Sequence, residues 1–312
     1  MLRVLRGLGV NVENLNDYPD LEEIKKIKNL KLALFNMYHI VKRPFLFFKV
    51  KKYLQSINCP VIVWNRDGSS NMGMKVWRQF ILKHAPLFDL YASHTLQDLG
   101  ALREKVLYLP NAAVIDDYYP SPALKQHYQY DVAFIGNMNA NKYPEVKKRV
   151  SFLNQLAINL KALNINYYFV GQEASLEQQR HIIQQSRINL QYHAGCDTRF
   201  RDKTRFERSW GLPERCYGIP ACGGFLLSDE RKHGSDDFGE DWCFFEDSQE
   251  DCINKIQYYL NNFDLTRAIA ERQQQRVLEQ HTYQHRALQL LHYAEEWQRQ
   301  STKSQQIQLT PI

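Results

Sequence analysis

Apolar and polar residues follow one another along the chain as short apolar runs separated by amphipathic stretches, in two successive sets. Such alternation is typical of α/β proteins with parallel sheets. In the first set we predict strands at 10–15, 31–37, 60–64, 90–93 and 106–109. Helical periods lie between them at 21–27, 44–55 and 74–84. This order predicts an N-terminal Rossmann-like domain over residues 1–118.

The second set begins with YDVAFIGNM and contains a long amphipathic helix. Its apolar face comprises Val146, Val150, Leu153, Leu156 and Leu160, which recur at the period of an α-helix. Further strands are predicted in NINYYFVG, RINLQYH, GGFLLSD and WCFFED, and Ser248 with Asp251 three residues later predicts a helix start. We predict a second Rossmann-like domain over 119–300, with terminal helices at 265–280 and 283–298, and a flexible tail at 301–312.

Residues 109–130 join the two sets. They contain three prolines and show little apolar periodicity, which indicates an interdomain linker. Ligands of doubly wound sheets bind beyond the carboxyl ends of the strands, often at helix N-termini. We therefore expect two doubly wound domains that face a cleft, with a ligand site at the strand ends.

Composition narrows the class of protein. No run approaches the ~18 apolar residues of a membrane-spanning helix, and the N-terminus lacks the apolar segment and cleavage site of a signal peptide. The six cysteines form no CxxC pair, so we expect a reducing, cytoplasmic compartment without disulfides or a zinc site. A net charge of +6 permits a nucleic-acid partner and suits a phosphate-bearing small ligand equally well.

The first candidate site is FIGNMNANKYPE, residues 134–145, where a buried strand ends in Gly136 and Asn137 before a polar loop and a helix. Gly136 permits a sharp turn, and the following amides can point at an anion. The alternative is a plain strand–loop–helix junction, which most α/β folds contain without a ligand.

The second candidate is ERCYGIPACGGFLLSDE, residues 214–230. Arg215 can form bidentate hydrogen bonds to a diphosphate, and Glu214 can accept hydrogen bonds from ribose hydroxyls. The small residues that permit close approach of the backbone are Ala221, Gly223 and Gly224. The alternative is a helix that runs tightly into the next strand, with small residues present only for packing.

Two further segments carry polar groups. In VIVWNRDGSSN a buried run delivers Asp67 to a turn, where it can act as a general base or merely cap an Asx-turn beside Gly68. His94 follows the strand LYAS and is a candidate for the cleft. In HAGCDTRFRDKTRFERSW, Arg199 and other arginines interleave with aromatic residues, a mixture that can clamp phosphate or stack on a base. The alternative is a solvated amphipathic segment.

Several of these segments resemble a known family. LPERCYGIPACGGFLLSDE and the following FEDSQEDCINKIQYYLNNFDLTRAIAERQQQRVLEQHTYQHRALQLL look like the C-terminal domain of CgeB-like (spore-protein type) glycosyltransferases. These are GT-B nucleotide-sugar enzymes with a glycosyl transferase family 1-like C-terminal domain. The shared features are an Arg before an aromatic residue, IPACGGFLL, an Asp after the strand, YYL, and HTY followed by Arg286. Weaker similarity extends the resemblance to residues 60–291.

The resemblance implies a GT-B fold and a metal-independent transfer of sugar from a nucleoside-diphosphate sugar, with a UDP-sugar as the expected co-substrate and no permanently bound cofactor. We predict Asp67 and His94 as catalytic residues. The predicted donor-binding residues are Gly136, Asn137, Arg199, Glu214, Arg215, Tyr217, Gly218, Ala221, Gly223 and Gly224. The acceptor stays open among a glycan, a protein and modified DNA.

Two departures from the family keep other hypotheses open. Gly218 stands where the family commonly has an acidic residue. The chain begins at what resembles the end of the family's first helix, so either the first domain is shortened at its N-terminus or the true start lies upstream. Both motivate a degenerate, non-catalytic nucleotide-binding module. The net charge and the arginines of residues 198–210 motivate instead a sugar transferase that acts on modified DNA bases.

Overall fold

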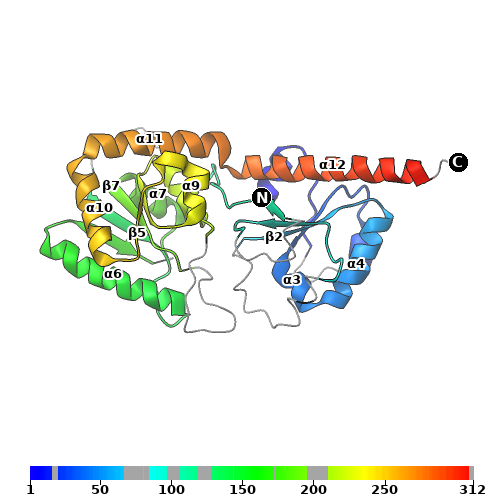
Figure 1. The fold of residues 1–312 in the computed structure, drawn as a ribbon, viewed down its shortest axis with the longest axis horizontal. Coiled ribbons are helices and arrows are strands. Elements are labelled where there is room, and N and C mark those ends of the chain that lie inside the picture. Colours follow the sequence, from blue (N-terminus) through cyan, green and yellow to red (C-terminus); the bar gives the residue numbers. More distant parts are fainter. Residues whose placement is uncertain are drawn as a thin grey trace. The chain divides into compact units, whose positions relative to one another are not determined.

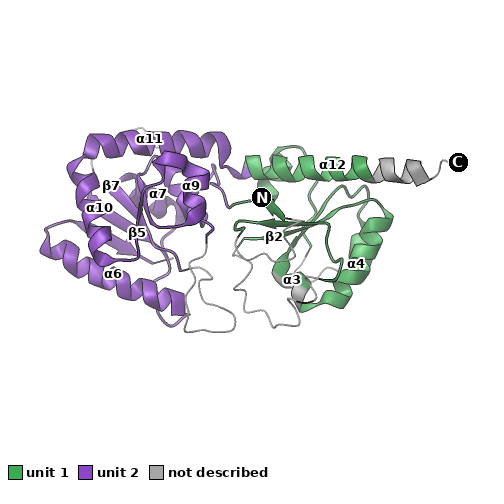
Figure 2. Cartoon of the chain, in the orientation of Figure 1, with its two compact units in different colours: residues 1–110, 284–312 green, residues 111–283 purple. Residues whose placement is uncertain are grey.

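The computed structural model divides the chain into two compact units, unit 1 (Met1–Pro110 and Gln284–Ile312) and unit 2 (Asn111–Tyr283), which Figure 2 colours separately. The residues that it describes are 1–15, 20–66, 80, 84–96, 106–118, 128–142, 144–171, 173–194 and 210–308, with backbone alone at 38–39, 41 and 301–308.

Unit 1 is built on a parallel sheet with the strand order β1-β2-β3-β4 (Figure 1). Its strands are β1 (Ala33–Asn36), β2 (Val61–Asn65), β3 (Leu90–Ser93) and β4 (Val106–Tyr108). Its N-terminal helices are α1 (Leu2–Gly7), α2 (Leu21–Lys26), α3 (Met37–Lys42) and α4 (Pro44–Ser56). Four of the five predicted strands are confirmed. The strand predicted at 10–15 is wrong: these residues are half-buried or exposed and pair with no strand, although Leu15 packs on the core.

Unit 2 contains a second parallel sheet, with the strand order β6-β5-β7-β8-β9. Its strands are β5 (Tyr130–Ile135), β6 (Tyr167–Val170), β7 (Ser186–Gln191), β8 (Leu226–Asp229) and β9 (Phe244–Phe245). Its helices are α6 (Pro144–Ala162), α7 (Leu176–Gln184), α8 (Arg215–Ala221), α9 (Lys232–Phe238), the 3₁₀ helix η3 (Gly239–Asp241), α10 (Gln249–Asn261) and α11 (Phe263–Gln280). All five strands predicted for this part of the chain are confirmed.

Helices cover both faces of the unit 2 sheet. Alternate residues of β5 enter opposite cores, because successive side chains of a strand point to opposite faces. Val132 and Phe134 pack with α6 and α10, whereas Ala133 and Ile135 pack with α7, α8 and α11. Parallel strands with helices on both faces make unit 2 a doubly wound, Rossmann-like domain.

The ends of the helices follow local sequence signals. The Ser248 hydroxyl accepts a hydrogen bond from the Asp251 amide at 3.0 Å, which confirms the predicted helix start of α10. The last helix, α12 (Tyr283–Gln308), continues past residue 301, where a flexible tail was predicted. Within the described ranges, every helix is too short or too polar to cross a bilayer.

The division between the units differs from the predicted boundaries at 118 and 300. Residues 111–118 group with unit 2 because Ala113 forms a bridge to Thr282. The part of α12 after Tyr283 groups with unit 1, where the Gln298 side chain donates hydrogen bonds to the carbonyls of Lys31 at 3.1 Å and Asn58 at 3.3 Å. Residues 109–118 therefore are part of the packed structure rather than a free linker.

Candidate functional site

Polar residues of unit 2 gather at the carboxyl edge of its sheet. Because β5, β7 and β8 are parallel neighbours, their carboxyl ends lie at the same edge. The residues found there are Gly136 and Asn137 after β5, Tyr192 and His193 after β7, and Asp229 at the end of β8. This edge is where doubly wound domains bind their ligands.

Arg149 of α6 connects the ends of β5 and β7. Its guanidinium donates hydrogen bonds to the carbonyl of Asn137 at 2.5 Å and to the carbonyl of Tyr192 at 3.4 Å, and lies 5.6 Å from the ring centroid of Phe134. The side chain is 6% exposed. A buried cation is thereby fixed directly behind the Gly136–Asn137 loop.

The backbone of that loop is partly committed to its own structure. The Gly136 amide donates to the Val170 carbonyl at 3.0 Å, and the Asn139 amide donates to the Asn137 side chain at 2.9 Å. These two amides already donate hydrogen bonds within unit 2, so an anion at this loop would have to bind to other amides. The cation behind the loop, Arg149, was missed by the sequence reasoning because nothing in its helical context distinguishes it from a surface arginine.

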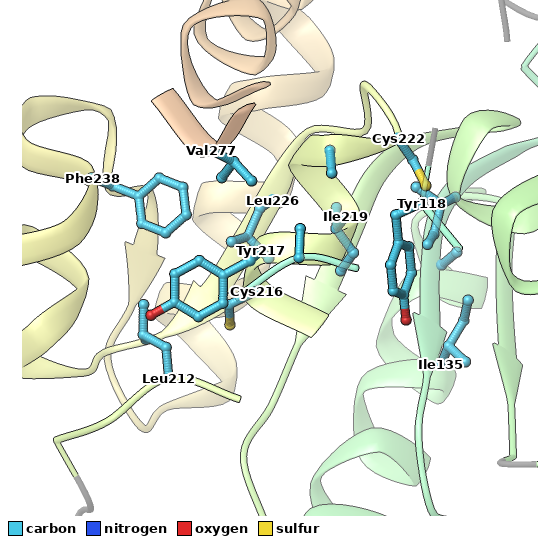
Figure 3. Close-up of a cluster of buried hydrophobic side chains, with 14 of the residues drawn as sticks. Tyr118, Ile135, Leu212, Cys216, Tyr217, Ile219, Cys222, Leu226, Phe238 and Val277 are labelled. Carbon is cyan, nitrogen blue, oxygen red and sulfur yellow. The ribbon is translucent and has the colours of Figure 1, made fainter. Parts of the chain in front are cut away.

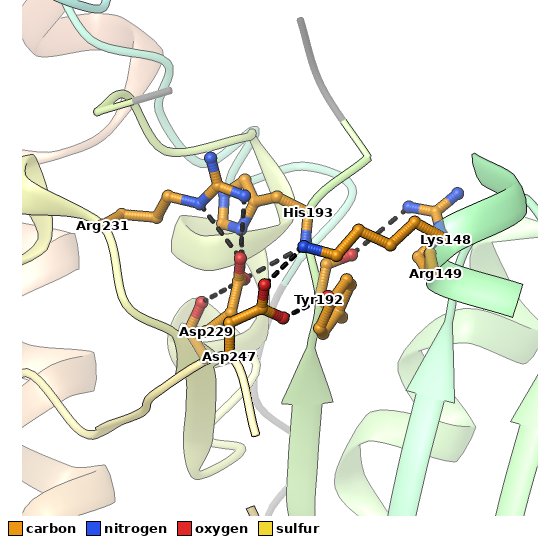
Figure 4. A network of polar contacts seen from close by, with 8 residues as sticks. Lys148, Arg149, Tyr192, His193, Asp229, Arg231 and Asp247 are labelled. Atoms are coloured by element: carbon orange, nitrogen blue, oxygen red, sulfur yellow. Dashed lines mark hydrogen bonds and ion pairs between the residues drawn. The ribbon is translucent and has the colours of Figure 1, made fainter. Parts of the chain in front are cut away.

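The ends of β7 and β8 are joined by a buried network centred on Asp229 (Figure 4). One carboxylate oxygen accepts hydrogen bonds from the His193 amide at 3.0 Å and lies 2.6 Å from His193 Nδ1. The other oxygen accepts from Arg231 Nη2 at 2.7 Å and Nε at 3.1 Å. Burial by itself would raise the pKa of Asp229, but the nearby Arg231 and His193 hold it well below its usual value.

The charge of Asp229 sets the state of the histidine. An ionised carboxylate can only accept hydrogen bonds, so Nδ1 of His193 carries a proton and the imidazole is held in one orientation. His193, Asp229 and Arg231 were absent from the predicted site. The ends of RINLQYH and GGFLLSD marked their positions, but the contact between them depends on the pairing of β7 with β8.

A second carboxylate supports the same edge. Asp247 accepts a hydrogen bond from the Tyr192 hydroxyl at 2.6 Å and forms an ion pair with Lys148 of α6 (Figure 4). Burial, followed by the hydrogen bond to Asp247, raises the pKa of Tyr192, which keeps its hydroxyl protonated. These contacts add a lysine beside Arg149 at the carboxyl edge.

Arg215 is the first residue of α8 and lies near this network. The charges of Asp229, Arg231 and Arg215 all act on the buried thiol of Cys216, which places the three groups around one point. Nε of Arg215 is buried, and in the described part of the chain the guanidinium has no hydrogen-bond or ion-pair partner. A half-buried cation without a counter-ion is suited to an anionic ligand.

Glu214 and Tyr217 are engaged within unit 2. The Glu214 carboxylate accepts a hydrogen bond from the Tyr283 hydroxyl at 2.5 Å. Tyr217 is buried, and its ring stacks on that of Phe238 (Figure 3). The ring also stacks on that of His281, and the hydroxyl donates to Asp237 at 2.5 Å. The ring and the hydroxyl of Tyr217 are both used within unit 2, and its donor contact stays a prediction.

The small residues of the GG corner lie at the other end of α8. They precede β8 and so lie at the amino edge of the sheet, away from Arg215. A Cβ on Gly224 would meet Asn189 Nδ2 at 2.7 Å, and Gly223 has a positive φ of 82°. The Ala221 carbonyl accepts from the Gln274 side chain at 3.2 Å. These contacts fit the packing interpretation, and the donor contacts of Ala221, Gly223 and Gly224 stay a prediction.

Gly218 is buried inside α8 beneath an aromatic ring. A Cβ at this position would lie 2.8 Å from Cε1 and Cζ of Tyr118. Gly218 is therefore covered by the Tyr118 ring and exposes no surface to a ligand. Gly218 packs against Tyr118, a residue that the sequence reasoning did not select, and its donor contact stays a prediction.

In unit 1, His94 follows β3 at the carboxyl edge of the sheet. The side chain is buried, and its amide donates to the Asn65 carbonyl at 3.3 Å. Nδ2 of Asn65 in turn donates to the Tyr91 hydroxyl at 2.6 Å. The predicted Asp67 and Arg199 lie outside the described residues. Among the residues that are described, no three His, Cys, Asp or Glu side chains gather as a metal site.

Comparisons with known proteins agree with this architecture. A family model described as "Glycosyl transferase-like" matches residues 121–292. No curated protein matches the sequence.

Among solved structures, the chain is similar to sucrose-phosphate synthase from Thermosynechococcus elongatus, with 11% identity and a TM-score of 0.60 over 88% of this chain and 75% of the other. It is similar to a glycosyltransferase from Rickettsia africae, with 11% identity and a TM-score of 0.59 over 95% and 87%. It is also similar to an alpha-glucosyltransferase in complex with UDP and a 13-mer DNA, with 12% identity and a TM-score of 0.52 over 86% and 80%. These likenesses show the fold.

Proposed function

Since the chain belongs to the glycosyl transferase-like family and is a glycosyltransferase of the GT-B fold, we propose that unit 2 binds a nucleoside-diphosphate sugar at the carboxyl edge of its sheet. The observation that carries this proposal is Arg215, a cation with a buried Nε and no counter-ion in the described part of the chain. Its guanidinium matches the charge and geometry of a diphosphate.

The surroundings of Arg215 support a site for a charged leaving group. Arg149 and Lys148 place positive charge beside the ends of β5 and β7, and His193 is oriented by Asp229 at the same edge. Fixed positive groups stabilise the negative charge that develops on a leaving diphosphate. We propose that these side chains supply this stabilisation without a bound metal ion, and that UDP is the nucleotide.

The reaction proposed is a single group transfer. An acceptor hydroxyl oxygen forms a bond to the anomeric carbon of the sugar, and the bond between that carbon and the β-phosphate oxygen breaks. The nucleoside diphosphate leaves with the electron pair, and the acceptor proton passes to a base. Asp67 is the proposed base, and His94 is the proposed residue that positions the acceptor.

The acceptor class is the open part of this proposal. The net charge of +6 favours an acidic acceptor, which includes phosphorylated glycans and modified DNA. Binding to duplex DNA weakens steeply as the salt concentration rises. Transfer to a neutral glycan has no such dependence on salt. Transfer assays at two salt concentrations therefore separate a modified-DNA acceptor from a neutral glycan.

The test is a thermal-shift screen of the chain with UDP, GDP, ADP and their sugars, because a ligand of the folded state raises the melting temperature. The bound donor is then incubated with acceptor panels, and the released nucleoside diphosphate is measured with and without EDTA. We expect binding of UDP and release that persists in EDTA. Absence of binding to every nucleoside diphosphate would contradict the proposed donor site, and loss of release in EDTA would contradict metal independence.

A further inference from the structure

Tyr118 is held rigidly beside the start of α8. Its amide donates to the Val114 carbonyl at 2.9 Å, and Arg180 of α7 donates to the carbonyl of Asp117 at 3.2 Å. The preceding Ala113 is bridged to the segment between α11 and α12, with its amide bonded to the His281 carbonyl at 2.9 Å. The position of the Tyr118 ring is therefore set by unit 2 itself.

The outer end of this ring covers Gly218. The three ring atoms nearest to a Cβ built on Gly218 are Cε1 and Cζ at 2.8 Å and Cε2 at 2.9 Å. These are the atoms adjacent to the hydroxyl, so the hydroxyl end lies over the backbone of α8. The glycine is required for this arrangement, because any side chain at 218 would displace the ring.

The hydroxyl of Tyr118 points along the sheet toward its carboxyl edge. Figure 3 shows the hydroxyl beside Ile135, the last residue of β5, with Cys222 at the opposite end of the side chain. Ile135 is followed directly by the Gly136–Asn137 loop. The hydroxyl therefore faces the same edge as Arg149 and Arg215.

This hydroxyl has hydrogen-bonding capacity that the described residues of unit 2 do not use. Tyr118 is 6% exposed, and within the described ranges its hydroxyl has no hydrogen-bond partner. Burial raises the pKa of Tyr118, with Arg215 opposing and Glu214 reinforcing the shift, so that the hydroxyl keeps its proton.

Arg215 and Gly218 are three residues apart in α8 and so lie on the same face of the helix. Because the Tyr118 ring covers Gly218, its hydroxyl and the Arg215 guanidinium are donors on one side of α8 that have no partner among the described residues. A group that accepts from both, and that carries the negative charge which Arg215 demands, is a phosphate oxygen. Resting on the proposed function, we propose that Tyr118 is a donor-recognition residue whose hydroxyl donates a hydrogen bond to the diphosphate that Arg215 binds. Gly218 is then the residue that admits the ring to this position.

The test compares the wild type with Tyr118→Phe, which keeps the ring over Gly218 and removes only the hydroxyl. The control is Tyr258→Phe, because Tyr258 is 50% exposed. UDP binding is measured by titration calorimetry and uridine binding by ligand-observed NMR, with circular dichroism to confirm folding. We expect Tyr118→Phe to weaken UDP binding about tenfold, as for a lost hydrogen bond to a charged group. Uridine binding should not change, and Tyr258→Phe should match the wild type with both ligands.

Two results would overturn this role while leaving the proposed function intact. Equal affinities of Tyr118→Phe and the wild type for UDP would remove the hydroxyl from the site. An equal loss for UDP and uridine would assign the hydroxyl to the nucleoside rather than the diphosphate. Failure of the wild type to bind any nucleoside diphosphate would instead contradict the donor site itself.

Discussion

The hydroxyl of Tyr283, the first residue of α12, donates a hydrogen bond to the carboxylate of Glu214, the residue before α8, at 2.5 Å. The neighbouring His281 stacks on Tyr217, and Thr282 bridges Ala113. Residues 281–283, the HTY motif, therefore connect α8 and the segment before Tyr118 to the junction of α11 and α12. The role of this motif is to hold Arg215 and Tyr118 in place.

Tyr283→Phe should destabilise the protein, because it leaves a half-buried carboxylate without this donor. We expect a loss of about 1–2 kcal/mol in the free energy of unfolding, measured by urea denaturation. Tyr168→Phe is the control, because Tyr168 is 38% exposed and its ring stacks on that of Tyr130. Equal urea midpoints for Tyr283→Phe and the wild type would show that the Glu214 contact contributes nothing.

Arg215→Ala should separate binding from stability. The guanidinium has no ion-pair partner in the described part of the chain, so its removal breaks no internal contact of that kind. We expect affinity for the nucleoside diphosphate to fall about a hundredfold, in line with a lost bidentate contact of ~3 kcal/mol, and the urea midpoint to stay within error. Arg299→Ala, which removes an exposed partner of Glu295, is the matched control. Unchanged affinity by calorimetry would remove Arg215 from the site.

Asp229→Asn should be strongly destabilising near neutral pH. The substitution removes the charge that Arg231 and His193 both bond in the interior, and breaking such a pair costs about 3–5 kcal/mol. The folded-state pKa of Asp229 is lowered, so its contribution is complete above the ordinary pKa of an aspartate and is lost as pH falls below that value toward the lowered pKa.

The corresponding measurement is urea unfolding of both proteins at pH 7, 5 and 3.5. The gap between wild type and Asp229→Asn should be equal at the two higher pH values and smaller at the lowest. A gap that widens as the pH falls would contradict the lowered pKa. Asp236→Asn serves as the control, since the Asp236 side chain is 59% exposed.

Gly218→Ala tests the fit of the Tyr118 ring. Alanine favours a helix over glycine by about 1 kcal/mol, but its Cβ would lie 2.8 Å from two ring atoms of Tyr118. We expect the clash to prevail, with lower stability and weaker UDP binding. Gly7→Ala is the matched control in α1, because nothing lies within 4 Å of its Cβ. A more stable Gly218→Ala protein with wild-type UDP affinity would contradict the role given to the ring.

The strands of unit 2 were predictable from sequence because each one contains adjacent or alternating apolar residues between polar flanks. Residues 10–15 show the limit of this signal: the alternation of VNVENL predicts a strand, but a strand needs a neighbour to pair with, and none lies there. The hydrophobic pattern of a segment indicates which side chains are buried, whereas the pairing of a strand depends on the presence of a neighbouring strand elsewhere in the fold.

The sequence predicts a site residue only where the type and position of that single residue indicate its function. Arg215 was selected for its charge and its place before a buried strand. Tyr118 and Gly218 lie far apart in sequence, so their contact cannot be found from either one. The same holds for His193 and Asp229, whose hydrogen bond follows from the register that sets Gln191 opposite Ser228.

The bridge between Ala113 and Thr282 brings the two ends of unit 2 side by side, while both flanking segments of the chain return to unit 1. Unit 2 is therefore an insertion: one uninterrupted stretch of coding sequence specifies it, whereas unit 1 is assembled from two. Neighbouring ends are the geometry that tolerates excision and transplantation of a domain. The continuous segment Asn111–Tyr283, which contains the proposed donor site, can accordingly be transferred between proteins as one unit.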